Sequence, residues 1–197
     1  GENAFDQQNW RLQKTSQTAT RVEVVFAYEQ AHLTNGYPGN ILATVRYTLT
    51  KDNQLQITYE ASSDAVTLFN PTNHSYFNLS AGTKDNILDH ELQILASAFT
   101  PVDETLIPTG EIKPVAGTPF DFRQPVRIGK RIDQVPGGYD HNFVLDNKGE
   151  LAVVARVFEP DSGRQLELLT TEPGLQFYSG NFLDGKIRGK AGKTYGP

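Results

Sequence analysis

The densest group of chemically active side chains in the sequence lies in the eleven residues 69–79, which read FNPTNHSYFNL. This segment holds one histidine, three asparagines and three aromatic rings. Aromatic faces can cover the C–H face of a pyranose while amide and imidazole groups match its hydroxyls, so the mixture is typical of a sugar site. The alternative is a polar turn in which His74 is a hydrogen-bonded structural imidazole, and composition alone does not separate the two.

Residues 70–79 resemble the signature of the aldose 1-epimerase (galactose mutarotase) family, and other segments resemble that family in the same order along the chain. These segments are GYPG at 36–39, FTPVDE at 99–104, IPTGE at 107–111, GTPFDF at 117–122, GYDHNF at 138–143, PGLQFY at 173–178 and GNF at 180–182. The resemblance covers nearly the whole chain. It implies a large antiparallel β-sandwich, the galactose mutarotase-like supersandwich, and a catalyst without a cofactor that interconverts the α and β anomers of a hexose, galactose or glucose.

The same resemblance assigns roles to three residues. His74 would be the acid that donates a proton to the ring oxygen, which suits imidazole because it exchanges protons near neutrality. Asp140 would accept hydrogen bonds from sugar hydroxyls, and the Gln176 amide would both donate and accept. The alternatives are a turn carboxylate that caps local N–H groups for Asp140 and a solvent-facing strand residue for Gln176.

The chain departs from the family pattern at both ends. The family's base is a glutamate downstream of the GNF segment, and its Asn-Arg pair and a second histidine lie upstream, so the chain alone would lack all of these. Glu172 does not sit at the position of the base. We therefore expect residues 1–197 to be a single domain of this fold that is incomplete at both termini. Missing strands would expose sheet edges, so we also expect a homodimer or association through those edges.

Two other functions fit the same residues. A non-catalytic carbohydrate-binding β-sandwich would need no base, because fold alone does not fix function. A hexose-6-phosphate 1-epimerase would need cations at the mouth of its pocket, and the loose cluster of Arg123, Arg127 and Arg131 is the candidate for that role.

The remaining histidines and the single tryptophan are predicted to be structural. His141 directly follows Asp140, so on a strand it would point to the opposite face, whereas His32 and His90 stand alone. No histidines or carboxylates have the spacing H-x-H or H-E-x-x-H, so no metal site is predicted. Trp10 is expected to be a packing residue rather than a sugar platform.

Composition favours an ordinary folded domain. Of 197 residues, 38% are hydrophobic and 21% are charged. The net charge of -5 and a pI near 5.4 argue against a nucleic-acid partner, which would need a basic face. No apolar run approaches the ~20 residues that span a bilayer. The absence of cysteine is compatible with reducing and oxidising compartments alike. We predict a cytoplasmic location. The partner predicted from the family resemblance is a monosaccharide.

The elements that must position these residues are predicted to be β-strands. Side chains alternate with period two along 41–50 and again along 55–60, and Lys51-Asp52-Asn53 between them favours a turn, so the two runs form a hairpin. A second hairpin joins 153–158 to 165–170 through Pro160-Asp161-Ser162-Gly163.

Five further runs have strand character and are bounded by turn residues: 21–26, 65–69, 90–95, 142–145 and 175–178. No window of a dozen residues has helical periodicity without a Gly or Pro break. The sequence therefore predicts an all-β sandwich or barrel, in which the long loop 98–124 can help to build a site.

Overall fold

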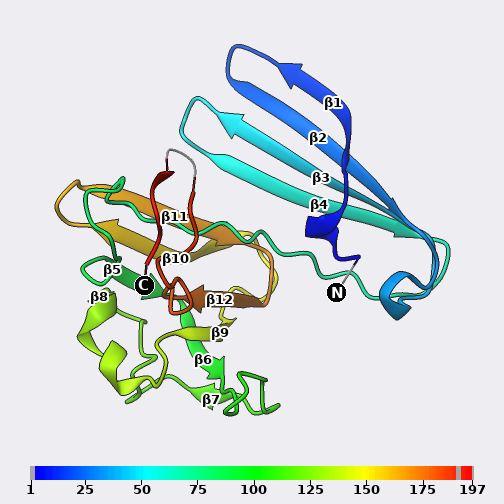
Figure 1. Cartoon of the computed structure of the whole chain (residues 1–197). Helices are drawn as coiled ribbons and strands as arrows, with labels where there is room; N and C mark the ends of the chain where they lie inside the picture. Colours follow the sequence, from blue (N-terminus) through cyan, green and yellow to red (C-terminus); the bar gives the residue numbers. More distant parts are fainter. Residues whose placement is uncertain (1–2, 190–191, 197) are drawn as a thin grey trace. The chain divides into compact units, whose positions relative to one another are not determined.

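The computed structural model of the chain describes residues 3–189 and 192–196 (Figure 1). They form two compact units, Gly1–Ser75 and Tyr76–Pro197, and each is described by itself. Every strand pairing in the described residues is antiparallel, and the helical elements there are the short 3-10 turns η1 (Phe5–Gln7), η2 (Thr34–Gly36), η3 (Ile128–Lys130) and η4 (Ile132–Gln134). The all-β prediction is confirmed.

The first unit is a four-stranded meander in the order β1-β2-β3-β4 (Figure 1). Its strands are β1 (Arg11–Gln17), β2 (Arg21–Gln30), β3 (Ile41–Thr50) and β4 (Leu55–Ser63). Alternation buries one face of β2 and β3, with Ala27 and Ala43 2% and 0% exposed. The predicted hairpin of β3 and β4 is confirmed, and Asn53 takes the left-handed conformation (φ 60°) that its tight turn requires.

Two differences from the predicted strands occur in this unit. Strand β1 was not predicted because its sequence, RLQKTSQ, is polar and shows no apolar alternation. Six of its seven residues are exposed, so the strand is stabilised by its pairing with β2 rather than by burial. The predicted strand 65–69 is wrong. Its apolar residues alternate, but Val66 and Leu68 are 96% and 76% exposed, and the run pairs with no strand among the described residues.

Trp10 packs in the first unit, as predicted. Its indole Nε1 donates to the backbone oxygen of Phe5 at 2.8 Å. The Trp10 ring lies 5.7 Å from the rings of both Phe5 and Tyr28, and Phe69 adds a fourth ring 6.2 Å from Phe5.

The second unit contains two four-stranded sheets, in the orders β11-β10-β5-β8 and β12-β9-β6-β7. The first sheet comprises β5 (Glu91–Ile94), β8 (Val126–Arg127), β10 (Ala152–Glu159) and β11 (Arg164–Thr170). The second comprises β6 (Ala96–Thr100), β7 (Lys113–Pro114), β9 (Asp140–Leu145) and β12 (Gly174–Tyr178). Leu95 alone separates β5 from β6, so the chain passes from one sheet to the other within one residue.

Both sheets of the second unit contribute to one hydrophobic core. The core takes Ile94 from β5, Val154 from β10, Phe99 from β6 and Phe143 from β9, each at most 5% exposed. Phe122, from the predicted loop 98–124, is 1% exposed in the same core. That segment is therefore less open than expected, since it also contains the end of β6 and the whole of β7.

The predicted second hairpin is confirmed as β10 and β11, and the predicted strands at 21–26, 90–95, 142–145 and 175–178 correspond to β2, β5, β9 and β12. The prediction that residues 1–197 form one domain stays a prediction. Among the residues that the structure describes, no helix has the length and apolar character needed to cross a membrane.

Candidate functional site

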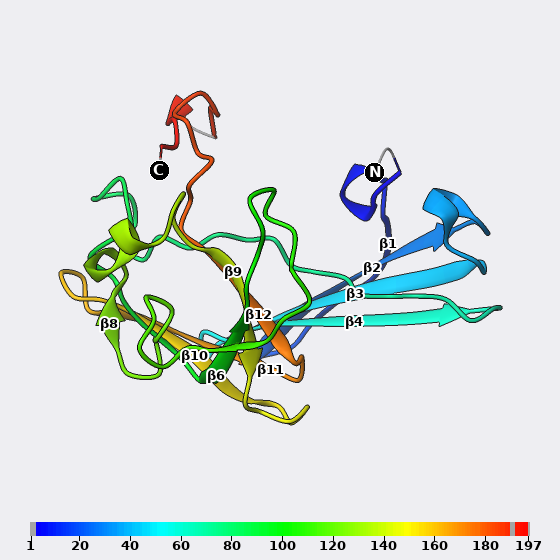
Figure 2. The same cartoon turned by 90° about the horizontal axis from the view of Figure 1, so that it is seen from below.

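Strands β9 and β12 lie side by side and pair antiparallel (Figure 2). In β9, His141, Phe143 and Leu145 are buried, so the alternate residues Asp140 and Asn142 lie on the other face. In the paired register Tyr178 lies opposite Asp140 and Gln176 lies opposite Asn142. These four residues, Asp140, Asn142, Gln176 and Tyr178, are called the β9–β12 face below.

A direct hydrogen bond joins two of the predicted site residues. The Gln176 amide Nε2 donates to Asp140 Oδ1 at 2.8 Å across the strand pair. Within the described part of the chain, Asp140 Oδ2 and Gln176 Oε1 accept no hydrogen bond. The pair therefore offers two acceptors and one remaining amide N–H to a ligand, which is the pattern that sugar hydroxyls match.

The Asn142 side chain depends on a glycine in the neighbouring strand. Gly174 pairs with Val144, two residues after Asn142. A Cβ built at Gly174 would lie 2.5 Å from Asn142 Oδ1. Since that is closer than van der Waals contact allows, any larger residue at Gly174 would move the amide of Asn142. Glycine at this position keeps the β9–β12 face open.

Exposed aromatic rings lie next to the polar pair. The Tyr178 ring stacks with Phe182 (6.0 Å, 16° between planes) and lies 5.4 Å from Tyr76. The Phe182 backbone N–H donates to Tyr178 Oη at 2.7 Å, which fixes the stack. Burial raises the pKa of Tyr76, and the nearby Tyr178 and Asp140 raise it further. Phe182 and Tyr76 remain 64% and 58% exposed, so much of each ring faces solvent.

His74 belongs to the first unit, next to its last residue, in the stretch 66–78 that has no regular secondary structure. The structure brings Asp140 and Gln176 together in the second unit. A role for His74 in the same site stays a prediction.

Sequence reasoning did not single out Asn142 and Tyr178, which lie on the β9–β12 face, or Phe182, which stacks on Tyr178. All three lie in the family-like segments 138–143, 173–178 and 180–182. Residues two apart on a strand share a face, so this rule would have identified two of them. Asn142 follows Asp140 by two residues, and Tyr178 follows Gln176 by two.

The other histidines accept backbone hydrogen bonds, as structural residues do. His141 Nδ1 accepts from the Asp140 N–H at 3.1 Å, its ring lies 4.5 Å from Phe120, and burial lowers its pKa. His32 Nδ1 accepts from the Gly39 N–H at 2.9 Å. His141 is buried while Asp140 lies on the opposite face of β9, as predicted.

His90 anchors the end of the family-like segment 70–79. Its Nε2 accepts the Leu79 N–H at 3.0 Å, and Arg164 Nη1 donates to the Leu79 oxygen at 3.1 Å. The His90 side chain is 1% exposed, and burial lowers its pKa. Leu79 is therefore held at both its backbone groups, three residues after Tyr76.

Metal ligands do not gather in the part of the chain that the structure describes: no group of three or more His, Cys, Asp or Glu side chains there could hold an ion. What the β9–β12 face offers is hydrogen bonds and ring faces.

The family model described as aldose 1-epimerase matches residues 3–196. The chain belongs to the aldose 1-epimerase family. It is 53% identical over 161 residues to galactose mutarotase of Sus scrofa, covering 81% of this chain and 47% of the relative. It is 43% identical over 191 residues to aldose 1-epimerase of Escherichia coli K12, covering 94% of this chain and 54% of the relative. The chain thus spans about half the length of these curated relatives.

Solved structures of this family have the same fold. Galactose 1-epimerase from Lactobacillus acidophilus NCFM superposes with a TM-score of 0.82 at 32% identity, covering 92% of this chain and 54% of that one. The GalM/aldose epimerase homologue from C. elegans superposes with a TM-score of 0.85 at 30% identity, covering 99% and 58%. The family and the galactose mutarotase-like fold inferred from the sequence are both confirmed.

Proposed function

We propose that the protein is an aldose 1-epimerase that interconverts the α and β anomers of a hexose, galactose or glucose. The observation that carries this proposal is the Asp140–Gln176 hydrogen bond beside the half-buried ring of Tyr178 and the exposed rings of Phe182 and Tyr76. Family membership supports it, as do the relatives named galactose mutarotase and aldose 1-epimerase.

The chemistry requires two proton carriers. A base removes the proton of the anomeric hydroxyl while an acid protonates the ring oxygen, the ring opens to the aldehyde, and closure from the other face gives the other anomer. Each carrier typically contributes about 10²- to 10⁴-fold. We assign the acid to His74 and the base to a glutamate outside residues 1–197. No cofactor enters these steps.

The β9–β12 face would bind and orient the sugar. Asp140 accepts only, so it selects hydroxyls that donate, and its bond to Gln176 fixes which end of that amide faces the ligand. Tyr178 and Phe182 would cover the apolar face of the pyranose. Holding the ring in one pose aligns its anomeric carbon with the two proton carriers.

Polarimetry of freshly dissolved α-galactose with the full-length protein tests this proposal. Wild type should accelerate mutarotation, His74→Ala should lower kcat by about 10²-fold or more, and Glu172→Gln should leave the rate unchanged. Glu172 is the matched control because it is an exposed carboxylate two residues before β12 begins.

A different outcome would replace the enzyme with a binding module. If the full-length protein binds galactose but does not accelerate the change in rotation, the site is a non-catalytic carbohydrate-binding face. The predicted homodimer or edge association and the predicted cytoplasmic location remain proposals beside this one.

A further inference from the structure

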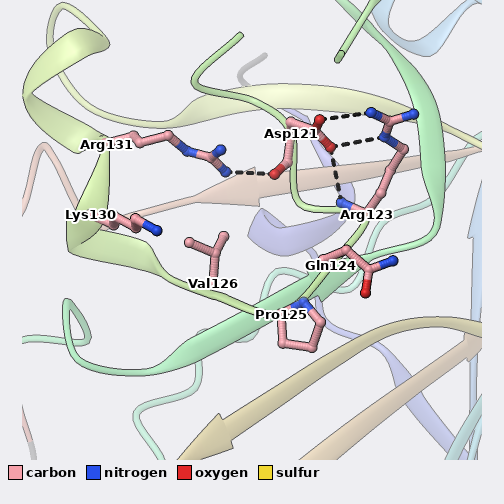
Figure 3. Close-up of a pocket in the computed structure, with 7 residues that line it drawn as sticks. All are labelled: Asp121, Arg123, Gln124, Pro125, Val126, Lys130 and Arg131. Carbon is pink, nitrogen blue, oxygen red and sulfur yellow. Dashed lines mark hydrogen bonds and ion pairs between the residues drawn. The ribbon is translucent and has the colours of Figure 1, made fainter. Parts of the chain in front are cut away.

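A cavity of about 470 Å³ lies in the second unit, apart from the residues of the β9–β12 face. It is called the basic cavity here and is lined by Asp121, Arg123, Gln124, Pro125, Val126, Lys130 and Arg131 (Figure 3). Three of its residues are cationic and one is a carboxylate, so the lining carries a net charge of +2. Of the three arginines singled out in the sequence, Arg123 and Arg131 line it and Arg127 does not.

The single carboxylate of the lining is already neutralised. Arg123 Nε donates to Asp121 Oδ1 at 2.9 Å, and Arg123 Nη2 donates to Asp121 Oδ2 at 2.7 Å. This bidentate pair is the reason that the pKa of Asp121 is lowered. Asp121 is therefore engaged by Arg123, and the charges of Lys130 and Arg131 remain to be balanced.

The Arg131 side chain is held by a backbone oxygen and an aromatic ring rather than by a carboxylate. Its Nη2 donates to the Asp121 backbone oxygen at 2.5 Å, and its guanidinium carbon lies 5.6 Å from the centre of the Phe122 ring. Neither Arg131 nor Lys130 forms an ion pair with any residue that the structure describes. Figure 3 shows both side chains pointing into the cavity from the same side, with Asp121 between Arg131 and Arg123.

We propose that the basic cavity binds the phosphate group of a small molecule. A dianionic phosphate would balance the two unpaired charges, with N–H groups of Arg131 donating in a fixed fork and Lys130 acting as a mobile point charge. The cavity is within the roughly 300–1,000 Å³ of small-molecule sites, so it has room for more than the phosphate. Gln124 would contact a polar ester group, and Pro125 and Val126 form an apolar floor.

Isothermal titration at fixed ionic strength tests this site, with inorganic phosphate, glucose 6-phosphate and glucose as separate probes. Both phosphates should bind in a way that depends on Lys130, whereas any binding of glucose, a sugar proposed for the β9–β12 face, should be the same in Lys130→Gln and wild type. Lys130→Gln should weaken phosphate binding about tenfold, as loss of a charge-assisted hydrogen bond does. Lys113→Gln is the matched control, because Lys113 pairs with Glu111 at 2.9 Å and lies outside the cavity, and it should not change the affinity.

Comparison of the two phosphates identifies the source of the ligand. If Lys130→Gln weakens binding of glucose 6-phosphate more than binding of inorganic phosphate, an organic ester fills the cavity, and equal weakening means that the ligand is free phosphate. The proposal is overturned if phosphate does not bind at millimolar concentration, or if Lys130→Gln and Lys113→Gln bind it as wild type does. Arg131 is not the primary target because its bond to the Asp121 oxygen also supports the local fold.

Discussion

At the scale of single residues, Asp140 and Gln176 define what the β9–β12 face can recognise. The Asp140 oxygen that is not bonded to Gln176 can accept a hydrogen bond but cannot donate one. The Gln176 amide can still do both. A ligand with several neighbouring hydroxyls satisfies both residues at once. The two side chains are joined by a hydrogen bond, so replacing either one alters the surroundings of the other.

Asp140→Asn should weaken galactose binding about tenfold or more, because the acceptor oxygen is replaced in part by an N–H donor that faces the Gln176 amide. Titration calorimetry with the full-length protein measures this loss. Asp146→Asn serves as the control, since Asp146 accepts from Ser97 Oγ at 2.8 Å and is not part of the face. Equal affinity in Asp140→Asn and wild type would exclude Asp140 from the sugar site.

Buried histidines make the stability of the second unit depend on pH. Burial lowers the pKa of both His90 and His141 in the folded state, so the unfolded chain binds more protons as the pH falls. Their contribution is fully present above about pH 6.5, the unfolded value, and is lost as the pH falls through the lower folded values. The free energy of unfolding should therefore decrease from pH 7 to pH 5.

Urea denaturation followed by circular dichroism at pH 7, 6 and 5 measures this dependence. His90→Gln removes one of the two titrations while its amide oxygen can still accept the Leu79 N–H, so the slope against pH should be smaller than in wild type. An unchanged slope in this variant would show that His90 does not titrate differently on unfolding.

At the scale of elements, the β10–β11 hairpin is stabilised from inside its turn. Glu159, at the end of β10, is 0% exposed and accepts from the Ser162 and Asp161 backbone N–H groups at 2.7 and 3.3 Å. Lys84 Nζ lies 3.6 Å from the same carboxylate and 2.6 Å from Asp161. Hydrogen bonding to Ser162, with help from Lys84, lowers the pKa of Glu159 to about 2.

Glu159→Gln should therefore flatten the acid limb of the stability curve. A carboxylate with a lowered folded pKa stabilises the protein above its unfolded pKa near 4.5, and this contribution is lost as the pH falls toward about 2. Acid titration followed by circular dichroism should show a shallower loss of structure for Glu159→Gln than for wild type. The exposed control Glu167→Gln, whose side chain pairs with Arg156 at 2.8 Å, should follow wild type over the same range.

Some of these elements could be predicted from the sequence and others could not. Alternation found β3, where Ile41, Ala43 and Val45 are buried, and β4, where alternate residues are partly buried. It missed β1, which is polar on both faces and depends on its neighbour, and it gave a false strand at 65–69, where Val66 has no partner to pack against. The family-like segments located Asp140 and Gln176, but only the register of β9 with β12 shows that their side chains meet.

At the scale of the molecule, the core of the second unit joins its two sheets. Phe122 lies between them, with ring contacts to Tyr139, Phe143 and Phe177 at 5.2 to 6.1 Å. It comes from a connecting segment, so this segment is part of the core. The residue before it, Asp121, lines the basic cavity, and Tyr139 directly precedes Asp140 of the β9–β12 face.

Phe122→Ala should lower the free energy of unfolding by about 3–5 kcal/mol, because it removes a buried ring and leaves a cavity. Phe182→Ala removes a ring that is 64% exposed and should cost much less. Urea denaturation of both variants compares the two costs directly. Similar losses would mean that the connecting segment is not part of the core.

The single tryptophan of residues 1–197 gives this 197-residue chain an internal reporter. Trp10 is packed against Phe5 and Tyr28 in the first unit, and the second unit contains no tryptophan. Intrinsic fluorescence excited at the indole band therefore monitors residues 1–75 alone, while the dichroism of the strands monitors both units. If the two signals change at the same urea concentration, the units unfold together as one cooperative domain, and if they separate, each unit has its own stability.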